Sequence, residues 1–341
     1  MGRNHEITTS QPLLDDQGSV IEPGWSRHQL QAYDRSQIKA PKWRIKEWDY
    51  YLVLSQEFGV ALTVSDDGYI GLQSATLLDF TAPKEHTATI LSTLPMGRMR
   101  LPSNSGPGET VFQNKRVTMR FSVTPGQRHL MCDFANFLGG QPFSCDITLT
   151  QPETETMVIA TPWAKSRTAF YYNQKINCLP ASGVARFAGR EYVFDPATCF
   201  GTLDWGRGVW TYDNTWKWAT GSALIDGHAF GFNLGYGFGD TTAATENVLF
   251  YDHRVHKLDD VEFHIPPDSY TKPWRFSSSD GRFEADFNPI IDRAAKINAG
   301  IIMTDQHQTF GRMNGQAILD DGTKLPIRDL LCSAEDVHNR Y

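Results

Sequence analysis

The chain lacks the short motifs on which most cofactor-dependent enzymes rely. None of its 341 residues form a Gly-x-Ser-x-Gly nucleophile elbow, a phosphate-binding loop or a His-Glu-x-x-His zinc motif. Each of these motifs places a reactive group or a phosphate in a set geometry, so their absence removes the usual sequence support for such chemistry. The sequence therefore predicts a protein without a cofactor.

Three further absences restrict the class of protein. The five cysteines form no Cys-x-x-Cys pair and are odd in number, which predicts reduced thiols and no zinc site. No apolar run is long enough for a signal peptide or a membrane span, so we expect a cytoplasmic protein without an integral membrane segment. The net charge of -7, with basic residues scattered, argues against nucleic acid as a partner. The cysteines are Cys132, Cys145, Cys178, Cys199 and Cys332.

Short alternating segments separated by turn signals predict a mainly β protein. Residues 50–64 read as two strands, followed by a turn at Asp66-Asp67-Gly68. The same pattern recurs around Asp226-Gly227, Asp280-Gly281 and Asp321-Gly322. Only residues 133–140 and 289–300 suggest short helices.

Strands at this spacing predict an all-β fold of two antiparallel barrels or sandwiches, because a single open sheet of this size would curl or split. We expect an N-terminal arm over 1–40, one domain over 41–194 and a second over 195–341. The arm has a turn signal at Asp16-Gln17-Gly18, and Trp25 is its expected anchor.

An aromatic cluster lies between Asp204 and Trp218, where DWGRGVWTYDNTWKW holds four of the nine tryptophans. Tryptophans also fill the cores of large β proteins, so packing alone is an alternative. Charged neighbours would be costly in an apolar core unless each were paired, and this favours a ligand pocket. The predicted ligand is a hydrophobic or partly polar small molecule. The aromatic candidates for binding it are Trp205, Trp210, Tyr212, Trp216, Trp218 and Tyr236.

Several separate motifs carry a resemblance to a known family. They are WRIKEWDYY at 43–51, DWGRGVW at 204–210, NLGYGFGDTTAATEN at 233–247, HKL at 256–258, HQTFG at 307–311 and AEDVHNRY at 334–341. With these motifs the chain resembles the bacterial proteins grouped as domain of unknown function 2804. That family is similar to calycin relatives that include carotenoid hydratases and fungal Diels-Alderases. The resemblance implies two lipocalin-like β-barrels and a ligand site among aromatic side chains.

The hydratase relatives imply an acid that protonates an alkene and aromatic faces that stabilise the resulting cation. Asp204, Asp240 and Glu246 are the candidate catalytic acids. The catalytic histidine and the tyrosine-aspartate pattern of the hydratases do not map onto this sequence residue by residue.

Residues 233–247 contain glycines at alternate positions rather than a Gly-x-Gly-x-x-Gly nucleotide loop. In a strand this spacing leaves one face bare, so that a ring or a ligand can lie against the backbone. Asn233 and Asn247 are counted with the ligand-binding residues. For Glu246 and Asn247, a structural hydrogen-bonding role is an equal alternative.

Arg207 and His307 each allow two interpretations. Arg207 between two glycines can bind an acidic ligand, or it can hold Asp204 or Glu246 in a buried ion pair. His307 is a candidate catalytic residue because Asp305 and Gln308 can fix its tautomer, with a hydrogen-bonded strand residue as the alternative. His253, His256 and His264 lack the spacing of a compact metal site, so no metal is predicted.

Three functions fit these features. The first is a small-molecule-binding protein acting as a cofactor-free lyase or isomerase on an unsaturated substrate, by hydratase-like acid-base chemistry. The second is a non-catalytic lipid or isoprenoid carrier, which needs the aromatic pocket but no perturbed carboxylate. The third is a carbohydrate-active enzyme with paired carboxylates on a tryptophan platform.

Overall fold

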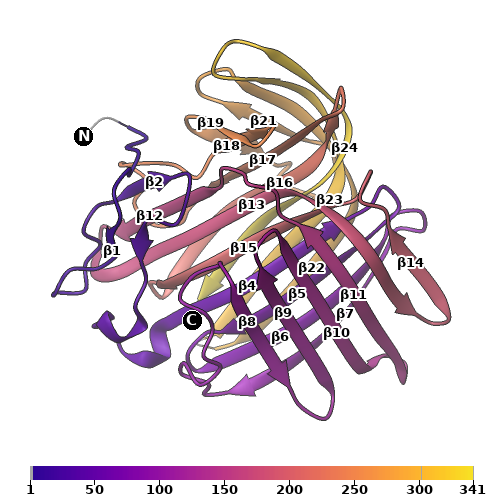
Figure 1. The fold of residues 1–341 in the computed structure, drawn as a ribbon, viewed down its shortest axis with the longest axis horizontal. Coiled ribbons are helices and arrows are strands. Elements are labelled where there is room, and N and C mark those ends of the chain that lie inside the picture. The colour runs from indigo at the N-terminus through magenta and orange to yellow at the C-terminus, as the bar shows by residue number, and fades with distance from the viewer. Residues whose placement is uncertain (1–2, 301, 341) are drawn as a thin grey trace.

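Two curled antiparallel sheets make up most of the computed structural model, which describes residues 3–300 and 302–340 (Figure 1). This confirms the all-β prediction. The first sheet follows the order β7-β6-β5-β4-β15-β13-β11-β10-β9-β8, with β12 and β14 also paired to β13 and β2 paired to β12. The second sheet follows the order β19-β18-β17-β16-β24-β23-β22-β21-β20.

The first sheet contains β2 (Gly24–Ser26), β4 (Ile45–Leu54), β5 (Phe58–Asp66), β6 (Ile70–Asp79), β7 (Lys84–Thr93), β8 (Gly108–Gln113), β9 (Val117–Thr124), β10 (Gln127–Leu138), β11 (Gln141–Thr150), β12 (Met157–Trp163), β13 (Ser166–Phe187), β14 (Arg190–Phe194) and β15 (Phe200–Val209). The second contains β16 (Asp213–Ile225), β17 (His228–Tyr236), β18 (Val248–Tyr251), β19 (Arg254–Lys257), β20 (Val261–His264), β21 (Trp274–Ser278), β22 (Phe283–Ala299), β23 (Ile302–Ile318) and β24 (Lys324–Arg340). The sheets change between β15 and β16, while the domain division at residue 195 stays a prediction.

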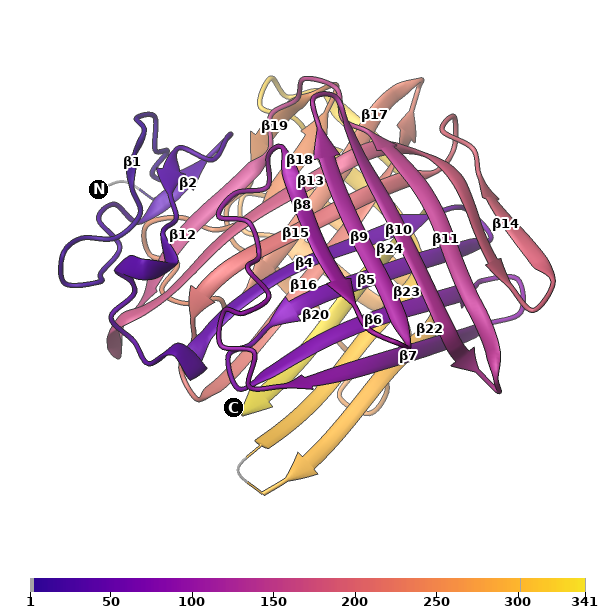
Figure 2. The ribbon, with the colours of Figure 1, turned by 60° about the horizontal axis from the view of Figure 1, so that its bottom comes forward.

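The N-terminal arm packs beside β12, at one end of the molecule (Figure 2). It contains a small parallel pair, β1 (Gln11–Pro12) and β3 (Gln31–Ala32), and the 3₁₀ turn η1 (Arg35–Gln37); a second turn, η2 (Lys42–Arg44), leads into β4. Trp25 on β2 is 2% exposed, and its ring belongs to a hydrophobic cluster with residues of both sheets. The expected anchoring role of Trp25 is confirmed.

The four aspartate-glycine turns predicted from the sequence all join consecutive antiparallel strands. Gly68, Gly227, Gly281 and Gly322 have φ values of +82°, +83°, +68° and +86°. Glycine adopts this left-handed conformation at little cost, whereas other residues are strained there. The turn residues therefore determine where these strands reverse.

The two predicted helices are wrong. Residues 133–138 continue β10, and the turn to β11 follows at Gly139 and Gly140, whose φ values are +59° and +82°. Residues 289–299 belong to β22, which pairs with β23 across a register shift near Pro289. Cross-strand pairing with a long neighbour outweighs the weak local helix preference in both segments.

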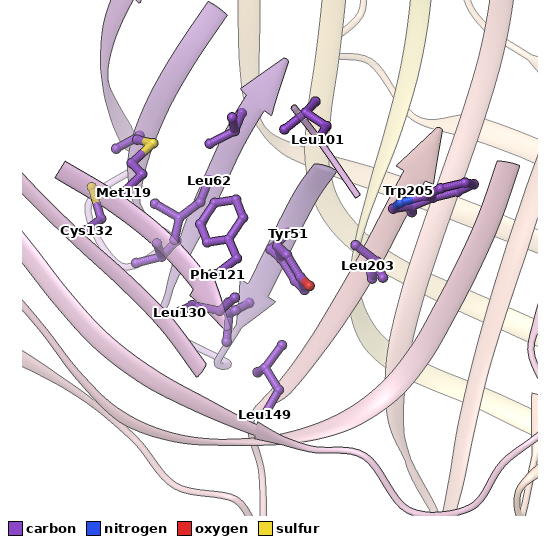
Figure 3. Close-up of a cluster of buried hydrophobic side chains, with 14 of the residues drawn as sticks. Tyr51, Leu62, Leu101, Met119, Phe121, Leu130, Cys132, Leu149, Leu203 and Trp205 are labelled. Atoms are coloured by element: carbon purple, nitrogen blue, oxygen red, sulfur yellow. The ribbon is translucent and has the colours of Figure 1, made fainter. Parts of the chain in front are cut away.

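The core of the first sheet lies on its inner face. Tyr51, Phe121, Leu203 and Trp205 pack together there with side chains from β5, β9, β10 and β11 (Figure 3). The opposite face of β4, β13 and β15 is turned toward the second sheet, because successive residues of a strand point to opposite sides. The candidate site lies between these facing surfaces.

Candidate active site between the two sheets

Two adjoining hollows, of about 350 and 190 Å³, lie between the sheets. Side chains from β4, β15, β16 and β24 line both of them. The residues shared by the two hollows are Trp48, Thr63, Asp204, Trp216, Trp218 and Glu335. Aromatic faces combined with converging polar groups are typical of a small-molecule site.

One row of cross-strand neighbours supplies the first sheet's side of the site. Tyr50 on β4 pairs with Asp204 on β15, and Asp204 pairs in turn with Lys175 on β13. The Lys175 Nζ lies 2.9 Å from the Asp204 Oδ1, and the Asn173 amide donates to the same oxygen at 2.6 Å. Lys175 is 1% exposed, so its ammonium depends on this carboxylate for compensation.

A matching row crosses the second sheet. Trp218 on β16 pairs with Glu335 on β24, followed by Gln308 on β23 and Arg293 on β22. The Trp216 indole donates to the Glu335 Oε1 at 2.9 Å, and the Gln308 amide donates to its Oε2 at 3.3 Å. Glu335 is thus held in place between the tryptophans by neutral donors.

The two rows meet across the gap. The Lys175 Nζ lies 4.2 Å from the centre of the Trp218 ring, and Tyr50 contacts the same ring edge to face at 6.0 Å. The Gln308 amide also donates to the Tyr50 hydroxyl at 3.3 Å. Charged and aromatic groups from both sheets therefore enclose one space.

Burial perturbs two acids near this space. It raises the pKa of Glu335 to about 7, although the Trp216 hydrogen bond and the charge of Lys175 act in the opposite direction. Burial likewise raises the pKa of Glu246 to about 7, with Lys175 opposing the shift and Asp204 adding to it. A carboxyl with a pKa near neutrality can give and take a proton at physiological pH.

Further tryptophans and other rings form the wall at the smaller hollow. Trp210 contacts Trp48 and Trp216 edge to face at 5.6 and 5.2 Å. Tyr171 stacks on Phe238 at 4.6 Å. These faces carry negative charge density and can stabilise a cation in the hollow.

The sequence matches the model of a protein family. The family model described as Domain of unknown function (DUF2804) matches residues 4–341. The chain belongs to the DUF2804 family. No curated protein matches its sequence.

Three solved structures resemble this DUF2804 protein. CghA has a TM-score of 0.59 at 11% identity, covering 98% of this chain and 96% of its own. A protein provisionally assigned as AttH, from Nitrosomonas europaea, has a TM-score of 0.53 at 13% identity, covering 90% of this chain and 96% of its own. Kievitone hydratase from Nectria haematococca has a TM-score of 0.49 at 10% identity, covering 97% and 98%. At these identities the likeness to CghA and to the AttH-like protein concerns the fold alone.

Two groups of the predicted site residues of the DUF2804 protein line hollows. Asp204, Trp210, Trp216 and Trp218 line the hollows between the sheets. Glu246 and Tyr236 line a much smaller hollow of about 10 Å³ next to Tyr171 and Phe238. Asn233 connects the two places, because its Oδ1 accepts from the Trp218 indole at 2.7 Å and its amide donates to the Glu246 backbone carbonyl at 2.9 Å.

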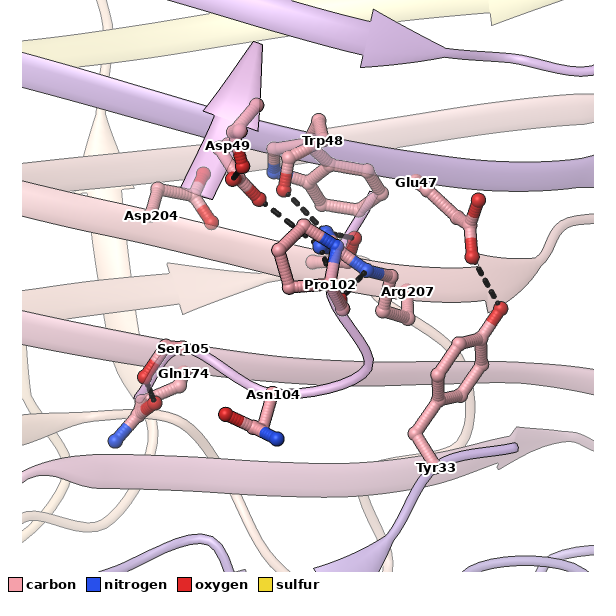
Figure 4. A network of polar contacts seen from close by, with 12 residues as sticks. Tyr33, Glu47, Trp48, Asp49, Pro102, Asn104, Ser105, Gln174, Asp204 and Arg207 are labelled. Carbon is pink, nitrogen blue, oxygen red and sulfur yellow. Dashed lines mark hydrogen bonds and ion pairs between the residues drawn. The ribbon is translucent and has the colours of Figure 1, made fainter. Parts of the chain in front are cut away.

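Trp205 and Arg207 lie on the opposite face of β15. Trp205 packs edge to face against Tyr172 at 5.7 Å in the core of the first sheet. Arg207 donates to Asp49 at 3.0 Å and to the carbonyls of Trp48 and Pro102 (Figure 4). The proposed pairing of Arg207 with Asp204 or Glu246 is therefore wrong, since strand alternation turns it toward Asp49.

The remaining candidates lie outside the two hollows. His307 stacks on Tyr270 at 3.7 Å and contacts Asp292 at 2.8 Å. The Asn247 Oδ1 accepts from the Gly235 backbone N–H at 2.7 Å. The Asp240 carboxylate accepts from the Thr242 N–H, and Tyr212 is 53% exposed. Catalytic or binding roles for these residues stay predictions.

Sequence reasoning missed Glu335, Lys175 and Trp48. Glu335 follows an apolar segment, and Leu331, Ser333 and Glu335 share one face of β24. Lys175 likewise interrupts the buried segment from Phe170 to Asn177. A lone charge on the buried face of a strand was the signal that could have identified Glu335 and Lys175.

Proposed function

We propose that the protein is a cofactor-free lyase or isomerase that protonates a carbon–carbon double bond of a hydrophobic, unsaturated substrate. The observation that supports this most directly is Glu335, a buried carboxyl with its pKa raised to about 7 that lines a tryptophan-walled hollow opposite Asp204. An acid near neutral pKa and a second carboxylate are the two groups that reversible proton transfer requires.

In the proposed reaction, the Glu335 carboxyl gives its proton to one alkene carbon. The π electrons form the new C–H bond and leave a cation at the other carbon, which faces Trp48, Trp216 and Trp218. Asp204 then accepts a proton, either from a neighbouring carbon to complete an isomerisation or from a water molecule whose oxygen bonds to the cation. Return of that proton to Glu335 restores the starting state.

Deuterium incorporation tests this proposal. The purified protein is incubated in D₂O with geraniol and linalool, and their mass and their binding are followed together. We expect deuterium on carbon with the wild type, and loss of that label with bound ligand retained in Glu335→Gln, which keeps the shape of the side chain.

The carrier alternative gives a different result. A carrier would bind these compounds without labelling them, and native mass spectrometry would detect the same complex with the wild type and with Glu335→Gln. Labelling that persists unchanged in Glu335→Gln would contradict the proposed role of this residue.

A further inference from the structure

A separate hollow of about 940 Å³ lies at the first sheet, away from the site between the sheets. The arm segment 28–33, the segment 103–107, the β9–β10 turn and the segment 151–156 surround it. None of its lining residues lines either of the two hollows described above. Gln174 lines this hollow, whereas its β13 neighbour Lys175 points to Asp204 and Trp218, because strand residues alternate between faces.

Arg128 is the distinctive group in this hollow. It is 2% exposed, yet no aspartate or glutamate oxygen lies within 4 Å of it in the described part of the chain. Its guanidinium donates to three neutral oxygens, the Gln151 Oε1 at 2.7 Å, the Tyr51 hydroxyl at 3.1 Å and the Ser105 carbonyl at 2.9 Å. A guanidinium has five N–H groups, so two remain for another acceptor.

Asp49 is a buried carboxylate close to this hollow, but it already has partners of its own. Asp49, Glu109 and Arg128 line a small hollow that shares residues with the large one, and the exposed Glu109 pairs with Arg120. Asp49, however, pairs with Arg207 at 3.0 Å and also accepts from the Thr110 hydroxyl. Glu153 on the rim is exposed. The positive charge of Arg128 is thus buried without a protein anion beside it, an arrangement that is costly unless a partner is supplied.

Gln29 also lines this hollow and carries a second unpartnered donor. The Gln29 side-chain oxygen accepts from the Ser105 backbone N–H at 3.0 Å, which orients the amide. The Gln29 Nε2 is buried and has no acceptor among the described residues. In the same wall, both polar atoms of the Gln174 amide already have a partner, because it donates to Thr156 and accepts from Ser105 (Figure 4).

We propose that this hollow binds a small organic molecule through a carboxylate, with Arg128 and the Gln29 amide as donors. A planar carboxylate matches the fork of a guanidinium, and its charge compensates Arg128. The neutral polar groups of the lining provide further hydrogen bonds, and the one carboxylate of the lining, Glu153, is exposed at the rim. This site is independent of the chemistry proposed between the sheets.

The test introduces a carboxylate side chain next to Arg128 by substitution. In Gln151→Glu the new side chain replaces an oxygen that already accepts from the Arg128 Nε, so the fold should be kept while the site loses its positive charge. Thermal unfolding and calorimetric binding are measured with succinate, citrate, octanoate and inorganic phosphate, against sodium chloride at equal ionic strength. Gln141→Glu, at the exposed start of β11, adds the same charge elsewhere as a control.

We expect at least one carboxylate to bind and to raise the melting temperature of the wild type and of Gln141→Glu more than chloride does. Gln151→Glu should weaken that binding by about tenfold or more, because like charges then face each other. Gln29→Leu should weaken it less. The proposal is overturned if no carboxylate exceeds chloride, if inorganic phosphate binds as tightly as the best carboxylate, or if Gln151→Glu responds like the wild type.

Discussion

Glu335 shows how a single buried acid can serve a site and cost stability at the same time. The residue is 8% exposed, and its carboxylate accepts hydrogen bonds from the neutral donors Trp216 and Gln308. Those hydrogen bonds do not offset the loss of hydration on ionisation, which is why burial dominates the pKa shift. The protonated form is therefore favoured up to neutral pH.

The raised pKa of Glu335 predicts a pH-dependent difference between the wild type and Glu335→Gln. The folded state holds the proton to about pH 7, whereas the unfolded chain releases it near 4.5. The contribution of Glu335 to the free energy of unfolding is therefore largest below pH 4.5, and it is lost as the pH rises to 7. Glu335→Gln carries no such loss, so its stability relative to the wild type should rise by about 3 kcal/mol across that window.

Urea unfolding of both proteins at pH 5 and pH 8 measures this difference. Glu85→Gln, a partly exposed acid on β7, provides the matched control and should show little relative change. A constant difference between wild type and Glu335→Gln at the two pH values would mean that Glu335 titrates normally.

Lys175 and Asp204 form a buried pair whose two members should not be equally replaceable. Asp204→Asn leaves the Lys175 ammonium buried without its carboxylate, which should lower the free energy of unfolding by about 3 to 5 kcal/mol. Adding Lys175→Met removes that unpaired charge and should recover much of the loss. Denaturant unfolding of the two single variants and the double variant forms the cycle. Additive losses in the double variant would contradict the pairing.

At the scale of strands, alternation sorts residues that are adjacent in the sequence into separate environments. Asp204 faces the second sheet, while Trp205 and Arg207 on either side of Gly206 face the interior of the first. The sequence identified the aromatic segment and its acid. The sequence did not show which face of the strand each residue occupies. Alternation assigns the faces only when the orientation of one residue is already known.

Hairpin turns were predictable because aspartate-glycine pairs have a local conformational cause. The site was only partly predictable because its two halves come from distant strands. Asp204 and Glu335 meet through the packing of two sheets, and no local pattern around Asp204 indicates β24 as its partner. The failed helix at 289–299 has the same origin, since pairing with β23 determines that segment.

Gly206 gives β15 the bare surface on which Trp48 of β4 lies. A Cβ atom at Gly206 would come within 2.0 Å of the Trp48 ring. Gly206→Ala should therefore push this ring toward the hollow and lower the free energy of unfolding by about 1 to 3 kcal/mol, the usual cost of overpacking. Trp48→Leu supplies the second arm of a double-mutant cycle. Gly206→Ala should cost clearly less in the Trp48→Leu background, and an equal cost would show that the ring is not the obstacle.

At the scale of the whole molecule, the site depends on how the two sheets are held together. Polar contacts cross the junction along its length: Arg293 to Thr76 at 2.7 Å, Gln308 to Tyr50 at 3.3 Å and Arg312 to the Gln56 carbonyl at 2.7 Å. A hydrophobic cluster that includes Tyr50, Trp218 and Phe310 fills the space between them.

Among the described residues, no helix has the length and the apolar character that a membrane span requires.

Asn177 makes the densest of these contacts. It lies on β13, is 4% exposed, and its amide donates to the Thr220 hydroxyl at 2.8 Å and to the carbonyls of Gly221 and Phe232 at 3.3 and 3.2 Å. Asn177→Ala removes these buried hydrogen bonds, while the Phe232 carbonyl keeps the one from the Thr220 hydroxyl, so we expect the free energy of unfolding to fall by about 1 to 3 kcal/mol. Asn298→Ala, at an exposed position on β22, should change it by less than about 0.5 kcal/mol.

The shape of the unfolding curve tests the coupling itself. Because both sheets contribute to one buried junction, neither half keeps its apolar face covered when the other unfolds, and a single transition is expected for the wild type and for Asn177→Ala. Intrinsic tryptophan fluorescence reports on both sheets, since Trp205 lies in the first and Trp274 in the second. Two separate transitions, with Asn177→Ala shifting only one, would show that the sheets fold independently and that the site forms by their later docking.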